Sequence, residues 1–233
     1  MTDFLSVKQL AEHLQVSDKT IYRMLWRGDL PGRRVGSQWR FSRAEVDFWL
    51  DLRLPQLAPP DLREMSRSAG GGTGSLGAAL TPRNALITLT PGSPAEVIRE
   101  LIDAIDFPEP VDRAALVARI QEREDTSSTS TAQGVAFLHT ARWEARVLQT
   151  SNLFAIGRLP APRDFGSSDG DPADLFFLLL ASDHRDHLAL LAGAARLSRV
   201  PVALAAIRAA RSGAEVVNIV RRAEATLMLE KES

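Results

Sequence analysis

The chain has 233 residues, of which 45% are hydrophobic and 24% are charged, and its formal net charge is −1. These values are ordinary for a soluble globular protein, and the length allows one large domain or two small ones. A net charge near zero gives no overall attraction to nucleic acid, so any basic surface must be local. The absence of cysteine excludes disulfides and thiolate chemistry.

Targeting and membrane segments are not expected in this sequence. The N-terminal stretch "MTDFLSVKQL" carries an acid at position 3 and has no long apolar core, which is unlike a signal peptide. The longest apolar stretch, "ADLFFLLLA", is far shorter than the roughly 20 residues that span a bilayer. We therefore expect a cytoplasmic protein without membrane insertion.

The composition changes once, between Leu54 and Thr81, where the chain is rich in Pro, Gly and Ser and has no apolar periodicity. Such a segment buries too little surface to offset its backbone entropy, so a flexible linker is predicted at 54–81. The "GGGTG" within it lacks the Gly-Lys-Ser/Thr of a phosphate-binding loop. The linker divides the chain into an N-terminal unit at 1–53 and a C-terminal unit at 82–230.

The N-terminal unit contains signals for three helices and a hairpin. Ser6 with Gln9 predicts a capping box, and Ser17 predicts the N-cap of a second helix that Gly28 ends. The alternating "RRVGSQWRF" predicts a two-stranded hairpin. Ser42 followed by Glu45 predicts the start of a third helix, "RAEVDFWL".

Helix, tight turn, helix and hairpin in this order are typical of a winged helix-turn-helix. The second helix would enter a major groove and the hairpin would lie against the DNA backbone or the minor groove. The candidate DNA-binding residues are Lys19, Thr20, Tyr22, Arg23 and Arg27 on the helix and Arg33, Arg34, Gln38 and Arg40 on the hairpin. The acids Asp18, Asp29, Glu45, Asp47 and Asp51 leave open a module that binds protein instead.

The first 50 residues resemble the excisionase and MerR-like helix-turn-helix family. The likeness is carried in order by "LSVKQLAEHLQVSDKTIYRML", "GDLPGRRVG" and "WRFSRAEVDFWL". The resemblance implies a double-stranded DNA partner. One such unit makes few contacts, so a homodimer is expected.

After Thr81 the pattern alternates between strands and helices. Strands are predicted at "NALITLT", "GVAFLH", "NLFAIGRL" and "DLFFLLLAS", and the last has no polar alternation, which indicates burial on both faces. Helices are predicted after Ser93, after Asp112, and in "RDHLALLAGAARLS" and "GAEVVNIVRRAEAT". The unit is therefore expected to be an α/β layered domain with a central mixed sheet flanked by helices.

The segment from about Asn84 to Met228 resembles the enzyme IIA domain of the bacterial phosphotransferase system, in its fructose, mannitol and nitrogen-regulatory class. The likeness is carried by "GVAFLHT", "NLFAIGRL" and "DGDPADLFFLLLASDHRDHLALLAGAARL". It implies that His139 accepts a phosphoryl group from an HPr-like phosphocarrier protein, that His187 is a second active-site histidine, and that Arg123 faces the phosphate.

These roles agree with the chemistry of the side chains. A neutral imidazole is a competent nucleophile near pH 7, and a guanidinium can neutralise phosphoryl oxygens. Two residues depart from the family pattern, because Leu138 stands in place of proline and Thr140 in place of glycine. A non-phosphorylated sensor therefore remains an alternative. The hydroxyl-rich "TSSTST" is interpreted as a solvated loop.

The remaining histidines have simpler interpretations. His13 is expected at the surface or the core edge, and His184 at an exposed helix start. "DHRDH" offers no third ligand at metal spacing, so neither a metal nor an organic cofactor is expected.

The sequence thus predicts a DNA-binding transcriptional regulator whose enzyme IIA-like domain senses the phosphotransferase system through a phosphohistidine, a carrier rather than a turnover enzyme. A phosphocarrier with an ancillary DNA-binding arm is the alternative.

Overall fold

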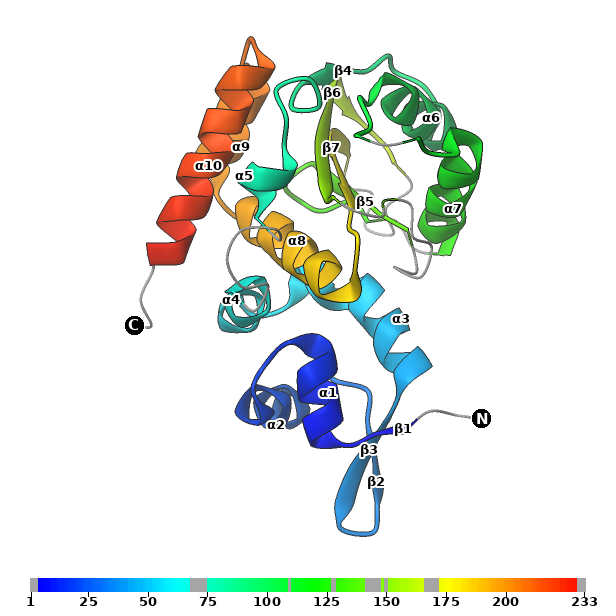
Figure 1. The fold of residues 1–233 in the computed structure, drawn as a ribbon, viewed down its shortest axis with the longest axis vertical. Coiled ribbons are helices and arrows are strands. Elements are labelled where there is room, and N and C mark those ends of the chain that lie inside the picture. The colour runs from blue at the N-terminus through cyan, green and yellow to red at the C-terminus, as the bar shows by residue number, and fades with distance from the viewer. Residues whose placement is uncertain are drawn as a thin grey trace.

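The computed structural model describes residues 4–67, 75–108, 110–126, 129–140, 148, 151–165 and 172–229. Its N-terminal unit is a winged helix-turn-helix, with the hairpin pointing away from the C-terminal unit (Figure 1). The elements of this unit are β1 (Phe4–Leu5), α1 (Val7–Leu14), α2 (Asp18–Arg27), β2 (Arg33–Val35), β3 (Gln38–Ser42) and α3 (Arg43–Arg53). The three strands form an antiparallel sheet in the order β1-β3-β2.

Local capping signals explain where most of these helices begin. The capping box of Ser6 and Gln9 is present, and the Ser17 side chain accepts a hydrogen bond from the Thr20 amide. Gly28 ends α2 with φ of 74°, a conformation that glycine adopts without steric cost. Ser42 is the N-cap of α3, as predicted, although its side chain makes no cap hydrogen bond.

The segment predicted as a flexible linker is folded over much of its length. It contains the 3-10 helix η1 (Leu54–Gln56), α4 (Pro59–Arg67) and α5 (Leu76–Ala79), while residues 68–74 lie outside the described part of the chain. In α4, Leu62 and Met65 are completely buried. Packing against α8 explains why α4 is a helix despite the surrounding composition, because an amphipathic segment is stabilised by the surface that it buries.

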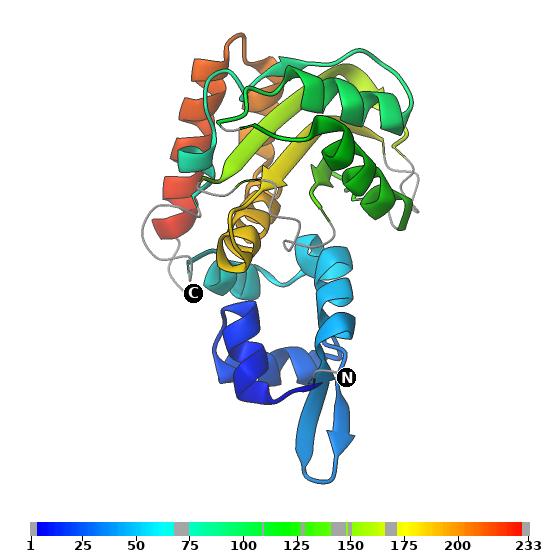
Figure 2. The same ribbon diagram turned by 45° about the vertical axis from the view of Figure 1, so that its right-hand side comes forward.

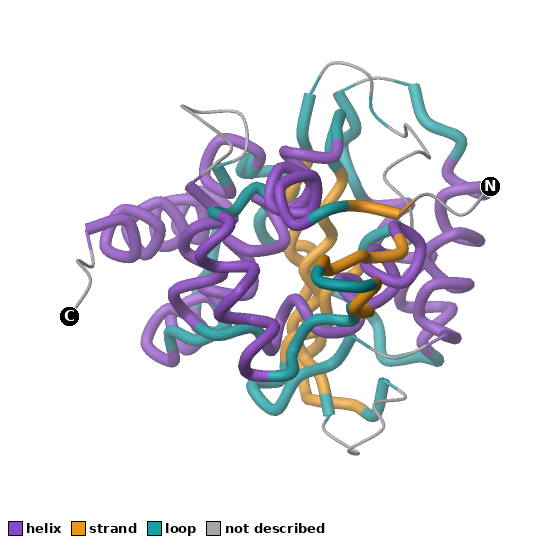
Figure 3. The backbone as a smooth tube through the Cα atoms, turned by 90° about the horizontal axis from the view of Figure 1, so that it is seen from below, coloured by secondary structure: helices purple, strands orange, loops and turns teal. Residues whose placement is uncertain are grey.

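A four-stranded mixed sheet forms the centre of the C-terminal unit, as predicted. Its order is β4-β6-β7-β5, with β6 and β7 antiparallel and both outer pairs parallel. The strands are β4 (Ile87–Thr88), β5 (Val135–Leu138), β6 (Leu153–Arg163) and β7 (Ala173–Leu180). Helices lie on both sides of these strands (Figures 2 and 3).

The central strand β7 separates two apolar clusters, because its successive side chains point to opposite faces. Leu175, Phe177 and Leu179 belong to one cluster, and Phe176 and Leu178 belong to the other. The second cluster is covered by α6 (Pro94–Ala104) and α7 (Arg113–Thr126), and the first by α8 (His184–Leu197), α9 (Pro201–Ala209) and α10 (Gly213–Leu229). Of these, α9 had no counterpart among the predicted elements.

The first apolar cluster continues into the N-terminal unit. It joins Leu10 and Ile21 of the winged helix-turn-helix, through Leu54 and Leu62, to Leu190 of α8. The two units therefore share a core in this structure. None of the described helices is long and apolar enough to cross a membrane alone, and α8 with α9 meets that test only as a pair bent by 89°.

Candidate functional site

Two histidine rings meet where β5 and α8 approach each other. His139 directly follows β5, and His187 lies in the first turn of α8. Their ring centroids are 5.6 Å apart with an interplanar angle of 62°. Both side chains are buried, with His139 2% and His187 7% exposed. The two histidines that the sequence analysis singled out are thus neighbours, although 48 positions separate His139 from His187 by number.

Arg123 joins this pair from the last turn of α7 and is also buried. Burial lowers the pKa of His139 well below its usual value, and the charges of Arg123 and His187 lower it further. Burial also lowers the pKa of His187 to about 4, with a smaller contribution from His184. Both imidazoles are therefore neutral at pH 7, and a neutral imidazole has the lone pair that a nucleophile needs.

The hydrogen bond of His139 indicates which nitrogen holds that lone pair. Nδ1 lies 3.2 Å from the carbonyl oxygen of Thr140, and a carbonyl oxygen can only accept, so Nδ1 carries the proton. In a neutral ring Nε2 is then the unprotonated atom. The geometry thus leaves Nε2 as the nucleophilic nitrogen of His139.

A buried polar chain anchors the strand that leads to His139. The Glu124 carboxylate accepts from the Thr129 amide at 3.1 Å and from its hydroxyl at 2.8 Å. The same hydroxyl accepts from the Phe137 amide at 3.1 Å. Thr129 belongs to "TSSTST", which was interpreted as a solvated loop. That interpretation is wrong for Thr129, because its side chain is buried, and residues 127–128 lie outside the described part.

Leu138 and Thr140, the two residues that depart from the family pattern, do not have positive φ. Among the residues that the structure describes, Gln15 alone has positive φ without being glycine. Thr140 therefore adopts a backbone conformation that any residue tolerates, and glycine is not required there. Leu138 is completely buried and pairs with Leu178 across the sheet. Leucine and threonine are thus both compatible with the backbone and the packing at these positions.

The first turn of α8 also contacts the N-terminal unit. The His184 ring stacks on that of His13 in α1, with centroids 4.4 Å apart and 17° between the planes. His184 Nε2 lies 3.0 Å from the His13 carbonyl oxygen, and His13 Nε2 lies 2.6 Å from Asp47 Oδ1. His184 was expected at an exposed helix start, but it is part of an interface between the two units.

The hairpin presents most of its predicted DNA-binding residues to solvent. Arg33, Arg34 and Gln38 are exposed, and Arg40 is half-buried. Arg33 forms an ion pair with Glu45 at 2.8 Å, and Arg40 bonds Gln38. The Glu45 carboxylate therefore turns to the hairpin rather than back to the N-cap residue Ser42.

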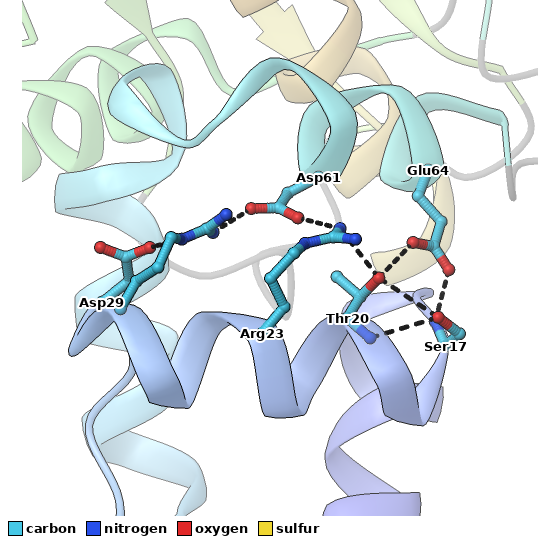
Figure 4. A network of polar contacts seen from close by, with 7 residues as sticks. Ser17, Thr20, Arg23, Asp29, Asp61 and Glu64 are labelled. Atoms are coloured by element: carbon cyan, nitrogen blue, oxygen red, sulfur yellow. Dashed lines mark hydrogen bonds and ion pairs between the residues drawn. The ribbon is translucent and has the colours of Figure 1, made fainter. Parts of the chain in front are cut away.

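The predicted residues of α2 divide between two faces of the helix. Lys19 and Tyr22 are exposed. In contrast, Thr20 is 1% exposed, and its hydroxyl donates to Glu64 of α4 at 2.6 Å. Arg23 and Arg27 both form ion pairs with Asp61 of α4 (Figure 4). The structure therefore covers Thr20, a predicted DNA-binding residue, with α4.

Trp26 is a surface residue that sequence reasoning missed. Its side chain is 86% exposed, which is unusual for an indole. Positions 19, 22 and 26 are three and four residues apart, so they share one face of α2. This spacing was the signal that could have placed Trp26 beside Lys19 and Tyr22.

Comparison with known proteins identifies both units. Residues 80–223 match the family described as "Phosphoenolpyruvate-dependent sugar phosphotransferase system, EIIA 2", and residues 4–51 match a helix-turn-helix domain. Two relatives named "Nitrogen regulatory protein", from Bradyrhizobium diazoefficiens and Pseudomonas aeruginosa, are each 32% identical to the chain. The matches cover 63% of this chain and 95% of the first relative, and 53% of this chain and 80% of the second.

Solved structures show the same fold for the C-terminal unit. The nitrogen regulatory protein IIA-Ntr of Neisseria meningitidis has a TM-score of 0.53 and 24% identity, covering 62% of this chain and 98% of its own. A putative PTS IIA domain from Streptococcus pyogenes has a TM-score of 0.52 and 23% identity, covering 64% of this chain and 96% of its own.

Proposed function

The chain belongs to the EIIA 2 family of the phosphoenolpyruvate-dependent sugar phosphotransferase system and carries a helix-turn-helix domain before it, and we propose that it is a DNA-binding transcriptional regulator controlled by phosphorylation of His139. One observation carries this proposal. His139 contacts His187 on α8, and the same turn of α8 contacts α1 of the helix-turn-helix through His184. A change at His139 is thus two contacts away from the DNA-binding unit.

The transfer step uses the groups assembled around His139. Nε2 attacks the phosphorus of a phosphohistidine on an HPr-like donor, the bond to the donor nitrogen breaks, and the donor imidazole leaves. Arg123 stabilises the charge on the phosphoryl oxygens, as a guanidinium does in other phosphoryl transfers. Because His139 is 2% exposed, the ring must be uncovered before a donor protein can reach it.

Phosphorylation changes the charge of a buried site. It adds about two negative charges at neutral pH, in a place where His187 is neutral and desolvated. The new charge favours protonation of His187 and hydration of the site, so it alters the first turn of α8. That turn holds the contact with His13, and the change therefore reaches the N-terminal unit.

The core shared by the two units favours a regulator over a phosphocarrier with an ancillary DNA-binding arm. An independent arm needs no apolar contact with the carrier domain, whereas here one cluster joins Leu10 and Ile21 to Leu190. Two copies of the chain would bind DNA as a homodimer, because one winged unit makes few contacts.

The test is phosphorylation by a phosphoenolpyruvate-driven donor chain, followed by detection of phosphohistidine. Wild type should become labelled, and His139→Ala should not. His13→Ala is the matched control, because it also removes a histidine but leaves the proposed acceptor, so it should be labelled like wild type. Phosphorylated and unphosphorylated protein should then differ in affinity for a DNA duplex.

The burial of His139 favours one second candidate, a regulator whose EIIA domain senses a partner without being phosphorylated. The same experiment separates the two functions. Absence of phosphohistidine in wild type, together with DNA binding that responds to the unmodified donor protein, would support the second candidate and contradict the first.

A further inference from the structure

Helix α4 places two carboxylates along one side of the DNA-binding helix α2 (Figure 4). Asp61 forms ion pairs with Arg23 and Arg27. Glu64 accepts from the Thr20 hydroxyl at 2.6 Å through Oε2, and from the Ser17 backbone amide at 2.5 Å through Oε1.

The donors that bind these carboxylates are of the kinds that bind DNA phosphates in general. Arginine guanidiniums, hydroxyls and the backbone amides at a helix N-terminus are common phosphate donors in protein–DNA interfaces. Here the N-cap Ser17, Thr20, Arg23 and Arg27 lie along one side of α2, and each donates to a carboxylate of α4. Arg27 also pairs with Asp29, at 2.6 Å. A carboxylate resembles a phosphate in charge and in its acceptor oxygens.

We propose that α4 is an intramolecular competitor of the DNA backbone, so that the structure described here is a low-affinity form of the protein. This inference rests on the proposed DNA-binding function and names how it is regulated. The opposite, exposed face of α2, with Lys19, Tyr22 and Trp26, remains available for a first, weak contact with DNA. Full engagement requires α4 to leave the donors of α2.

The position of α4 connects this competition to the EIIA domain. Arg196 of α8 donates to Ser66 Oγ of α4 at 2.8 Å, and Arg199 donates to the Leu57 carbonyl at 2.7 Å. Leu62 and Met65 are completely buried, and α4 packs along α8. A displacement of α8 therefore moves α4, and with it the carboxylates on α2.

The two carboxylates differ in how safely they can be replaced. Asp61 is completely buried against two arginines whose side chains are 36% and 33% exposed, so replacing it disturbs the packing of α4 as well as both ion pairs. Glu64 is half-buried. Glu64→Gln keeps an oxygen that can accept a hydrogen bond but removes the charge, so it is the variant that tests competition without unfolding the unit.

The experiment measures affinity for a short random-sequence duplex over a range of salt concentrations. We expect Glu64→Gln to bind about tenfold more tightly than wild type, with a slope of log K against log salt steeper by about one for each additional phosphate that the protein neutralises. The control is Glu12→Gln, which removes the same charge from an exposed position on α1 of the same unit. Equal affinities of the two variants would overturn the proposal.

A second measurement follows α4 directly. Because the chain has no cysteine, Lys8→Cys and Arg67→Cys place one spin label on α1 and one on α4, both at exposed positions. Saturating DNA should lengthen the distance between the labels, and an unchanged distance would overturn the displacement of α4. If no variant binds DNA, the proposed function fails as well. If all bind DNA equally, only the competition fails.

Discussion

His184 and His13 stack their imidazole rings with centroids 4.4 Å apart, although they belong to the EIIA domain and the helix-turn-helix domain respectively. One helical turn separates His184 from His187, whose ring contacts His139. The rings of His187 and His184 on α8 and of His13 on α1 thus connect the proposed acceptor, His139, to the DNA-binding unit. A single substitution at His184 removes its stacking contact with His13.

We predict that His184→Ala separates phosphorylation from the DNA response. The variant keeps His139, His187 and Arg123, so phosphohistidine should form at close to the wild-type rate. It loses the stack on His13, so the affinity for DNA should no longer change on phosphorylation. The measurement is a DNA titration before and after treatment with the donor chain. Arg185→Ala, at the exposed next position, should behave as wild type, and an equal loss of response there would contradict the prediction.

The buried His187 predicts a stability that depends on pH. Its pKa is about 4 in the folded protein and 6.5 when unperturbed, so between these pH values the unfolded chain binds more protons than the folded one. Stability therefore falls as the pH is lowered from 6.5 toward 4, by up to about 3 kcal/mol from this group.

Urea unfolding at a series of pH values checks this prediction. His187→Gln removes the titrating group, so its stability should decline less over the same interval. A wild type and a variant with parallel pH profiles would show that His187 titrates normally in the folded protein.

The polar chain from Glu124 to β5 predicts a role for the Thr129 hydroxyl. Thr129→Val preserves the shape of the side chain but leaves the Phe137 amide and the Glu124 carboxylate without this partner. We expect a loss of about 1–3 kcal/mol in the free energy of unfolding, as for other buried groups whose hydrogen bond is removed. Thr129→Ser keeps the hydroxyl and should lose less. Urea denaturation of both variants distinguishes the hydrogen bonds from the packing of the methyl group.

Local signals explain how much of the fold was predictable. The capping boxes at Ser6 and Ser93 operate over three residues, and both are present. The absence of polar alternation in β7 predicted burial on both faces, and every residue of the strand is buried. The mixed sheet flanked by helices was predicted from the same alternation of patterns. These features depend on neighbours that are close in sequence.

The features that were not predicted depend on residues far apart in sequence. Glu64 is 44 positions from Thr20, and it is this contact that buries the threonine. His184 is 171 positions from His13. The helix α4 is stabilised by its packing on α8, and its short apolar pattern of Leu62 and Met65 was hidden by the Pro- and Gly-rich composition around it. Tertiary contacts therefore determine that part of the predicted linker is helical, which face of α2 is covered, and where the two units meet.

Trp26 offers a final prediction about the face of α2 that remains open. Its indole is 86% exposed, so Trp26→Ala should change the free energy of unfolding by no more than about 0.5 kcal/mol. The indole shares its helix face with Lys19 and Tyr22, where DNA is proposed to make its first contact. Loss of a large apolar contact at an interface commonly costs about 1 kcal/mol or more, so affinity for a DNA duplex should fall several-fold. Val202→Ala, at an 80% exposed position on α9, is the control and should leave DNA affinity unchanged. Unaltered DNA binding by Trp26→Ala would move the contact surface away from this face of α2 and toward the hairpin, where Arg33 and Arg34 are exposed.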